Sequence, residues 1–232
     1  MTNLSALPDT TPFENNLLEA VMEYSMLQHP FYVAWTEGKL SQSVLGEYAK
    51  QYYAHVRAFP TYVSAVHSRC DDLAIRQELL ENLIEEERGE ENHPELWMRF
   101  AEGLGVARED VSNAKLLSST EDSVARLKSL TASEDYRDGL AALYAYESQV
   151  PEVARTKREG LKAFYGMEDE RAVSFFRVHE GIDVLHQQIE KQILSANCRT
   201  ADEQRRAVEV AKESAKALWA FLDGVTAAYV SA

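Results

Sequence analysis

Two histidines and an aspartate lie close together in the C-terminal third of the chain. His179, Asp183 and His186 are separated by four and then three residues. On a continuous helix seven residues turn through roughly 700°, so the three side chains share one face to within about 20°. Imidazole and carboxylate groups in this arrangement suit a first-row transition metal such as iron or manganese. The spacing therefore predicts metal ligands on one helix face.

Three further residues upstream extend this pattern. Glu86 and His93 repeat the seven-residue separation, and Glu147 lies in an otherwise apolar stretch, 143–148. A carboxylate on an apolar face needs a cation or a hydrogen-bond partner if it is buried. Each group alone also fits an ordinary solvated polar face, as the glutamate run 85–87 illustrates. Together the residues offer three imidazoles and three carboxylates from three helices, as carboxylate sites in helix bundles do.

Tyrosine and lysine make a second set of candidate reactive groups. Lys157 follows Glu147 by ten residues, about three helical turns, so both can lie on one side of a helix. Its neighbours Arg155 and Arg158 favour the alternative of an exposed basic face. Most tyrosines in a globular protein pack in the core, but one beside an oxygen-activating metal is oxidisable. The chain has eleven tyrosines, among them Tyr32, Tyr48, Tyr52, Tyr53, Tyr144 and Tyr146.

The composition indicates that helices must position these residues. The chain has 232 residues, 45% of them hydrophobic, with only 10 glycines and 6 prolines, which disfavours a fold of short strands and turns. A net charge of −14 with no basic stripe argues against nucleic acid as a partner. Cys70 and Cys198 form no disulfide framework, and no secretory signal or membrane span is visible. We therefore expect a cytoplasmic all-α protein.

Hydrophobic spacing and helix-breaking residues divide the chain further. We expect a disordered lead over 1–12, followed by one helical domain over 13–232. His29-Pro30 should interrupt the first helix, Ser41 should cap the next, and Pro60 should kink or break it. We expect the helix that begins near residue 72 to continue through Gly89, so that it carries both Glu86 and His93. The other expected elements are a loop over 106–118 and helices over 119–132, 135–165 with a bend at Pro151, 168–195, and 201–230.

Five stretches of the chain resemble a known group of proteins. They are HPFYVAW (29–35), YAKQYYAHVRAFP (48–60), HSRCDDL (67–73), YAYESQVP (144–151) and HEGIDVLH (179–186). They look like the chlamydial protein associating with death domains and its bacterial relatives. That group lies in the haem-oxygenase-like superfamily, with pyrroloquinoline-quinone synthase and type II thiaminase. The resemblance covers about residues 13–190.

The resemblance implies a fold, a cofactor and an activity. The fold would be a haem-oxygenase-like bundle of seven to eight helices without haem. Its cofactor would be two metal ions, iron with iron or iron with manganese, and dioxygen and an external electron donor would be co-substrates. The activity would be formation of p-aminobenzoate for folate, and the protein would be a homodimer. The six residues that would hold the metal are Glu86, His93, Glu147, His179, Asp183 and His186.

The same resemblance implies that the protein is its own substrate. Tyr32 matches the residue that would donate the ring, and Lys157 matches the one that would donate the amino group. Tyr48 and Tyr146 would orient oxygen species or relay electrons. Such a protein turns over once, because it consumes its own side chains.

Two alternatives remain open from the sequence. The first is an oxidase or oxygenase that acts on an external small molecule, as pyrroloquinoline-quinone synthase does. The second is a non-catalytic module that binds death domains through surface helices. A thiaminase-like hydrolase is disfavoured, because neither Cys70 nor Cys198 lies in a context that supports a nucleophile.

Overall fold

The computed structural model describes residues 11–230, and every regular element in that range is helical, which confirms the predicted all-α class. The expected disordered lead lies outside the described residues as far as residue 10. In chain order the elements are α1 (Pro12–Met22), η1 (Met26–Gln28), α2 (Pro30–Thr36), α3 (Gln42–Arg69), α4 (Leu73–Glu87), α5 (His93–Gly103), α6 (Arg108–Ser112), α7 (Ser118–Thr131), α8 (Tyr136–Glu147), α9 (Val150–Tyr165), α10 (Glu170–His179), α11 (Ile182–Asn197), α12 (Ala201–Val225) and η2 (Thr226–Val230).

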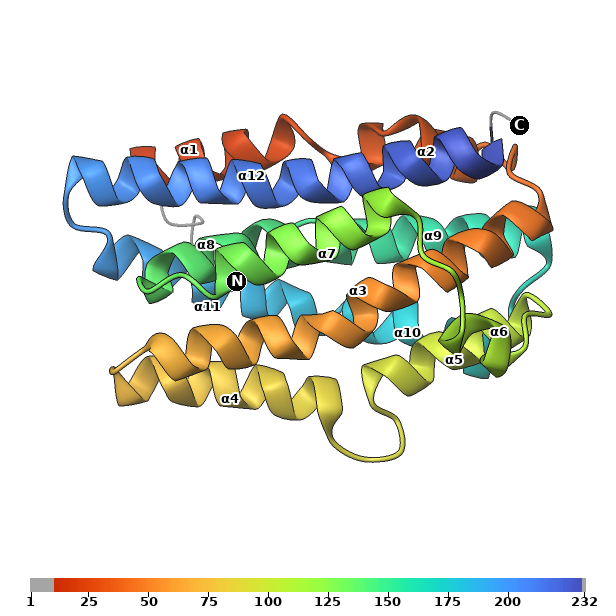
Figure 1. Ribbon diagram of the computed structural model, residues 1–232, viewed down its shortest axis with the longest axis horizontal. Coiled ribbons are helices and arrows are strands. Elements are labelled where there is room, and N and C mark those ends of the chain that lie inside the picture. The colour runs from red at the N-terminus through yellow and green to blue at the C-terminus, as the bar shows by residue number, and fades with distance from the viewer. Residues whose placement is uncertain (1–10, 231–232) are drawn as a thin grey trace, which may run out of the picture.

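The two longest helices, α12 and α3, lie in different layers of the molecule. In Figure 1, α12 runs along the upper edge beside α1 and α2, whereas α3 crosses the middle above α4. Helix α12 packs on α7, α8 and α1, and α3 packs on α4, α5 and α7. Helices α8 to α11 fill the space between these layers. The polar residues on which the site depends therefore lie in the interior of the bundle.

Local chemistry explains where several helices begin. Ser41 caps α3 as predicted, because its side chain accepts a hydrogen bond from the Val44 amide. Helix α1 already ends at Met22, before the interruption that we expected at His29-Pro30, and His29 Nδ1 accepts from the Phe31 amide at 3.0 Å to cap α2. Pro60 does not break α3, which runs unbroken to Arg69. Burial of Pro60 and its neighbours in the core outweighs the hydrogen bond lost at the proline.

Two helices that we expected to be continuous are interrupted. Helix α4 ends at Glu87, Arg88 is extended, and Gly89 then turns the chain with a φ of +84°, a left-handed conformation that favours glycine. Asn92 then starts α5, because its Oδ1 accepts from the Glu95 amide at 3.0 Å and its Nδ2 donates to the Gly89 carbonyl at 2.8 Å. The prediction of one helix through Gly89 was therefore wrong. Glu86 lies near the end of α4, and His93 is the first residue of α5.

The predicted helix over 168–195 is also two helices. Helix α10 ends at His179, and α11 begins at Ile182 after a turn at Glu180 and Gly181. The argument that placed three ligands on one continuous helix face was therefore wrong, since the turn separates His179 from the other two. The expected helix over 135–165 is likewise divided, between Glu147 and Val150, with Pro151 in the first turn of α9. The expected loop over 106–118 contains the short helix α6.

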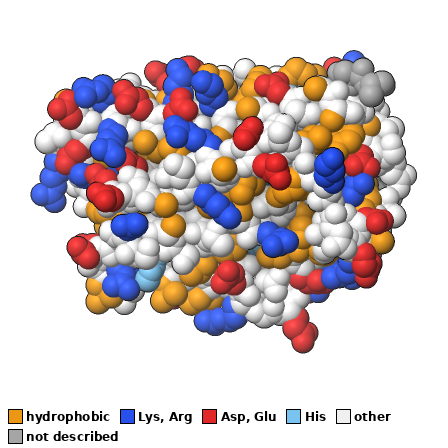
Figure 2. Space-filling model, in the orientation of Figure 1, with side chains coloured by type: hydrophobic (Ala, Val, Ile, Leu, Met, Phe, Trp, Pro, Cys, Tyr) orange, Lys and Arg blue, Asp and Glu red, His pale blue; other side chains and the backbone are white. Residues whose placement is uncertain are grey.

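The surface carries charges of both signs. On the face drawn in Figure 2, basic and acidic side chains alternate with apolar ones and form no single-sign stripe. Among residues 11–230, no helix combines the length and apolar character required to span a bilayer.

Candidate metal centre

Glu86, His93 and His179 form a first buried trio. Each offers a ligand atom, and these atoms all lie within 4.8 Å of one another. His93 Nδ1 is 2.8 Å from Glu86 Oε1, and the imidazole rings of His93 and His179 are 4.3 Å apart. All three side chains are less than 8% exposed. Helices α4, α5 and α10 thus bring one carboxylate and two imidazoles together at their ends.

Glu147, Asp183 and His186 form a second buried trio with the opposite composition. Its ligand atoms also lie within 4.8 Å of one another. His186 Nδ1 is 3.3 Å from Glu147 Oε1 and 3.8 Å from Asp183 Oδ1. Helices α8 and α11 supply these groups, two carboxylates and one imidazole. The structure therefore brings all six sequence-predicted side chains together, but in two groups that divide the heptad between His179 and Asp183.

Several ligand atoms in these trios have no hydrogen-bond partner among the described residues. They include His93 Nδ1, His186 Nδ1 and Glu147 Oε2. Buried polar atoms are normally paired, and those that are not need an explanation. Nitrogen and carboxylate atoms that converge without hydrogen-bonding geometry are what a cation between them requires. The residues present therefore fit two metal ions with mixed nitrogen and oxygen ligands.

The hydrogen bonds of the remaining ring nitrogens indicate which nitrogen each histidine offers. His179 Nδ1 is 2.7 Å from the Phe175 carbonyl, and His186 Nε2 is 2.9 Å from Glu85 Oε2. A metal-binding histidine commonly donates its other N–H to a carbonyl or carboxylate, which fixes the ring. His179 is thus arranged to bind through Nε2, and His186 through Nδ1.

The electrostatics of the trios are unfavourable without cations. Burial, followed by the neighbouring Glu147 and Glu86 carboxylates, raises the pKa of Asp183 well above its usual value. Burial likewise raises the pKa of Glu86 and lowers that of His179. Bound divalent ions reverse this situation, because they are the largest local charges and stabilise the ionised carboxylates.

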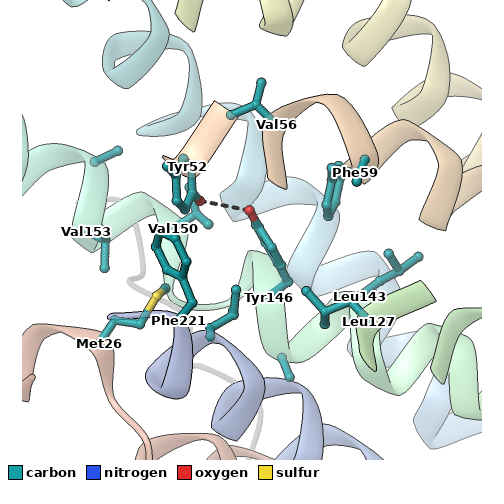
Figure 3. Packing of buried hydrophobic residues seen from close by; sticks show 14 of the residues in the cluster. Met26, Tyr52, Val56, Phe59, Leu127, Leu143, Tyr146, Val150, Val153 and Phe221 are labelled. Atoms are coloured by element: carbon teal, nitrogen blue, oxygen red, sulfur yellow. Dashed lines mark hydrogen bonds between the residues drawn. The ribbon is translucent and has the colours of Figure 1, made fainter. Parts of the chain in front are cut away.

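The two trios face a common cavity with aromatic walls. Five of the six side chains line this cavity, all except His186. Tyr52 and Tyr146 also line it, and their hydroxyl groups are 2.8 Å apart. Figure 3 shows the two phenols pointing toward one another from α3 and α8, among Val56, Phe59 and Val150. An apolar cavity next to the trios excludes bulk water from the ions that they would hold.

A second buried cluster adjoins this cavity, and we call it the tyrosine–lysine cluster (Tyr32, Tyr48, Tyr52, Tyr146 and Lys157). Lys157 Nζ donates to Tyr48 Oη at 2.7 Å, and the Tyr48 and Tyr32 hydroxyls are 3.0 Å apart. The Tyr48 and Tyr52 rings stack at 5.5 Å with an interplanar angle of 26°. The cluster thus extends from the cavity, through Tyr52 and Tyr48, to Tyr32.

Lys157 has no carboxylate partner in this environment. Its Nζ lies 4.7 to 6.0 Å from six aromatic ring centroids, those of Tyr32, Trp35, Tyr48, Tyr52, Trp97 and Phe176. Burial lowers the pKa of Lys157 well below its usual value. The exposed basic face suggested by the sequence holds for Arg155, which pairs with Glu152 and Glu159 on the surface, but not for Lys157.

Three residues around the second trio escaped the sequence analysis. Asn82 Nδ2 donates to Glu147 Oε1 at 2.9 Å, Glu85 contacts His186, and Glu190 is a buried acid beside Glu147. A signal for Glu190 was present in the sequence. It follows Asp183 by seven residues and His186 by four, which is the spacing of one helix face.

Known sequences similar to this chain include 4-aminobenzoate synthases and, at 24–25% identity, pyrroloquinoline-quinone synthases. A family model described as an iron-containing redox enzyme matches residues 46–219. The chain is 43% identical to the 4-aminobenzoate synthase of Nitrosomonas europaea over 225 residues. The aligned residues cover 93% of this chain and 92% of the relative. It is 40% identical to the 4-aminobenzoate synthase of Chlamydia trachomatis serovar D over 198 residues, and the aligned residues cover 85% of each protein.

Solved structures confirm the predicted fold. A TenA homologue from Pseudomonas syringae superposes with a TM-score of 0.82 at 16% identity, over 98% of both chains. At this identity the likeness concerns the fold alone. It is the haem-oxygenase-like bundle that the sequence resemblance implied.

Proposed function

Because this chain belongs to the family of iron-containing redox enzymes, we propose that it forms 4-aminobenzoate, with dioxygen and an external reductant as co-substrates. Its own Tyr32 supplies the ring, and its own Lys157 supplies the amino nitrogen. The observation that carries the proposal is the buried hydrogen-bonded chain from Lys157 Nζ through Tyr48 to Tyr32. It holds together the two groups that an aminobenzoate combines, an aromatic ring and an amine, beside the two trios.

The two trios hold one metal ion each in this proposal, iron with iron or iron with manganese. When bound, such ions supply the capacity to bind and reduce dioxygen. The chain contributes the ligand geometry and a cavity whose apolar walls exclude water, with Phe59 and Phe175 among its lining residues.

Lys157 is prepared for its role by burial. Its lowered pKa favours the neutral amine, whose nitrogen retains the lone pair that a bond to carbon requires. The hydrogen bond to Tyr48 fixes the amine 4.7 Å from the centroid of the Tyr32 ring. Burial also raises the pKa of Tyr32 and Tyr48, so both phenols stay protonated until they are oxidised.

Tyr52 and Tyr146 connect the cavity to Tyr32. Tyr32 does not line the cavity, whereas Tyr52 and Tyr146 do. Electrons that leave Tyr32 therefore pass through Tyr48 and Tyr52, which stack on one another. The hydrogen bond between Tyr52 and Tyr146 joins the two phenols where they line the cavity. Tyr52 thus joins Tyr48 and Tyr146 in the relay.

Isotope labelling tests the proposal directly. Protein made with ring-¹³C tyrosine and side-chain ¹⁵N lysine is loaded anaerobically with Fe(II) and Mn(II), then given unlabelled amino acids, dioxygen and a reductant. We expect at most one equivalent of 4-aminobenzoate that carries both labels, and a protein mass loss that peptide mapping locates at Tyr32. Tyr53→Phe is the matched control, because Tyr53 is a half-buried tyrosine of the same helix as Tyr48.

Other outcomes would select a different function. Many turnovers with unlabelled product and an unchanged protein mass would identify an oxidase of an external substrate. A death-domain-binding module predicts no product, and binding that survives replacement of His179 or His186. Either result would overturn the self-substrate proposal.

A further inference from the structure

A second cavity lies next to the second trio and has His186 among its lining residues. It lies between α4, α8 and α11, and its lining residues include Glu78, Asn82, His186 and Glu190. The two cavities share no lining residue. Glu147 and Asp183 face the aromatic cavity, whereas His186 faces the second one. The second trio therefore stands between the two cavities.

Three oxygen atoms on the second cavity have no hydrogen-bond partner among the described residues. They are Asn82 Oδ1 and both carboxylate oxygens of Glu190. Glu190 is only 3% exposed, and Asn82 only 4%. Asn82 Nδ2 donates to Glu147 Oε1, so this bond fixes the amide with its oxygen free. A buried carboxylate without a donor is costly, and a divalent cation bound by oxygen ligands removes that cost.

The surroundings connect these oxygens to both the solvent and the trio. Glu78 is exposed and lies one helical turn before Asn82 on α4. Glu85 lies one turn after Asn82. Its side chain is partly exposed and contacts Nε2 of the buried His186 at 2.9 Å. Carboxylate and amide oxygens thus continue from the surface at Glu78, through Asn82 and Glu190, to Glu147.

The two cavities differ in where their oxygen atoms lie. The carboxylates that line the aromatic cavity, Glu86, Glu147 and Asp183, all belong to the trios, and its other walls are aromatic or aliphatic apart from the Tyr52 and Tyr146 hydroxyls. The second cavity has aliphatic walls as well, but Glu78, Asn82 and Glu190 add oxygen atoms outside the trios, where they can replace the water that an incoming ion loses.

From this geometry we propose that the second cavity is the loading route for divalent cations, in which Glu190 and Asn82 Oδ1 form a transient site that passes the ion to Glu147 and His186. The aromatic cavity is thereby left to dioxygen. The inference rests on the metal binding in the proposed function, but not on the identity of the product.

The rate of cation uptake tests this route. Metal-free protein is mixed anaerobically with Co(II) in a stopped-flow instrument, and ligand-field absorption reports binding. We expect Glu190→Gln to slow uptake at least about 10-fold, the lower range for electrostatic guidance of an ion. Release to a chelator should slow as well, because a transit ligand serves both directions, and the final stoichiometry should stay at two ions. Glu78→Gln, at the exposed mouth, should slow uptake by a smaller factor that salt abolishes.

A matched variant separates the route from general charge effects. Glu81→Gln removes the same charge from an exposed position of α4 that does not line the cavity, and it should leave uptake unchanged. Uptake that is unaltered in both Glu190→Gln and Glu78→Gln would overturn the route. So would unaltered uptake with faster release in Glu190→Gln, which would make Glu190 a support for the bound ion. If the unaltered chain bound no Co(II), the metal centre of the proposed function would fail as well.

Discussion

The two trios and the tyrosine–lysine cluster are neighbouring buried polar regions that satisfy their polar atoms in opposite ways. In the trios, His93 Nδ1, His186 Nδ1 and Glu147 Oε2 converge without hydrogen bonds to the described residues. In the tyrosine–lysine cluster, all four hydroxyls and the amine are hydrogen-bonded to one another. The first region thus requires an ion to be complete, whereas the second is complete once the chain folds.

The largest expected effect is the loss of product, and it should follow from a substitution in either region. Only the substitution in a trio should also weaken cation binding. His179→Ala should remove 4-aminobenzoate formation and also lower cation affinity at the first trio by more than about 100-fold, the upper range for outer-shell changes. Tyr32→Phe should abolish the product equally, yet retain two ions. Metal analysis after desalting, together with mass spectrometry of small molecules, measures both. Product from Tyr32→Phe would show that this ring is not the source.

Cation binding should stabilise the protein through the trios alone. At a free concentration of 100 times Kd, one site adds about 2.7 kcal/mol to the free energy of unfolding. For a chain of this size, that corresponds to a rise in Tm of about 5 to 10 °C. Anaerobic calorimetry with Mn(II) should show this rise in Tyr48→Phe but a smaller one in His186→Ala. Equal rises in both variants would mean that the second trio holds no ion.

The sequence predicted the members of the trios better than the backbone that carries them. The spacing selected six residues that the structure brings together, although their role as ligands stays a prediction. The spacing argument assumed continuous helices, and that assumption was wrong. The chain breaks these helices around Gly89 and at the turn of Glu180 and Gly181. Because the turns at these breaks are short, the side chains before and after each break still face the same region of the interior. Periodicity cannot detect such breaks, since a left-handed glycine and a capping asparagine look ordinary in a polar stretch.

The tyrosine–lysine cluster was less accessible to sequence reasoning. The neighbours of Lys157 favoured an exposed basic face over the side shared with Glu147, and the family resemblance implied a role as amino donor, whereas the structure shows that the side chain is buried. The aromatic environment of Lys157 comes from α2, α3, α5 and α10, which are far apart in the chain. No local pattern encodes that convergence. Glu190, by contrast, lay on the same helix face as Asp183 and His186.

The uncharged state of Lys157 should be visible in the pH dependence of stability. Because burial lowers its pKa in the folded state, the unfolded chain holds one more proton over the range just below the usual lysine pKa. Stability then rises with pH by about 1.4 kcal/mol per unit from this group. The buried phenols, whose pKa is raised, are protonated in both states only well below the usual tyrosine pKa of about 10, so they add little to the slope up to about pH 8.5.

Lys157→Met should remove this slope. Urea unfolding at about pH 7.5, 8.0 and 8.5, below the range in which tyrosines of the unfolded chain ionise, measures it. Lys162→Met is the control, since Lys162 lies exposed on the same helix. A slope that persists in Lys157→Met would mean that the buried amine is charged, which would remove the nucleophile from the proposed reaction.

The smallest expected effect tests whether the tyrosine–lysine cluster is complete without metal. In metal-free protein, a double-mutant cycle of Tyr52→Phe and Tyr146→Phe should give a coupling of about 1 kcal/mol, the contribution of one buried hydrogen bond. Tyr62 is also buried, but its hydroxyl faces the Val124 carbonyl instead. The cycle of Tyr52→Phe with Tyr62→Phe should therefore be additive to within about 0.5 kcal/mol. If the Tyr52–Tyr146 coupling appeared only after Mn(II) was added, the phenols would depend on the ion for their arrangement, and the contrast between the two regions would fail.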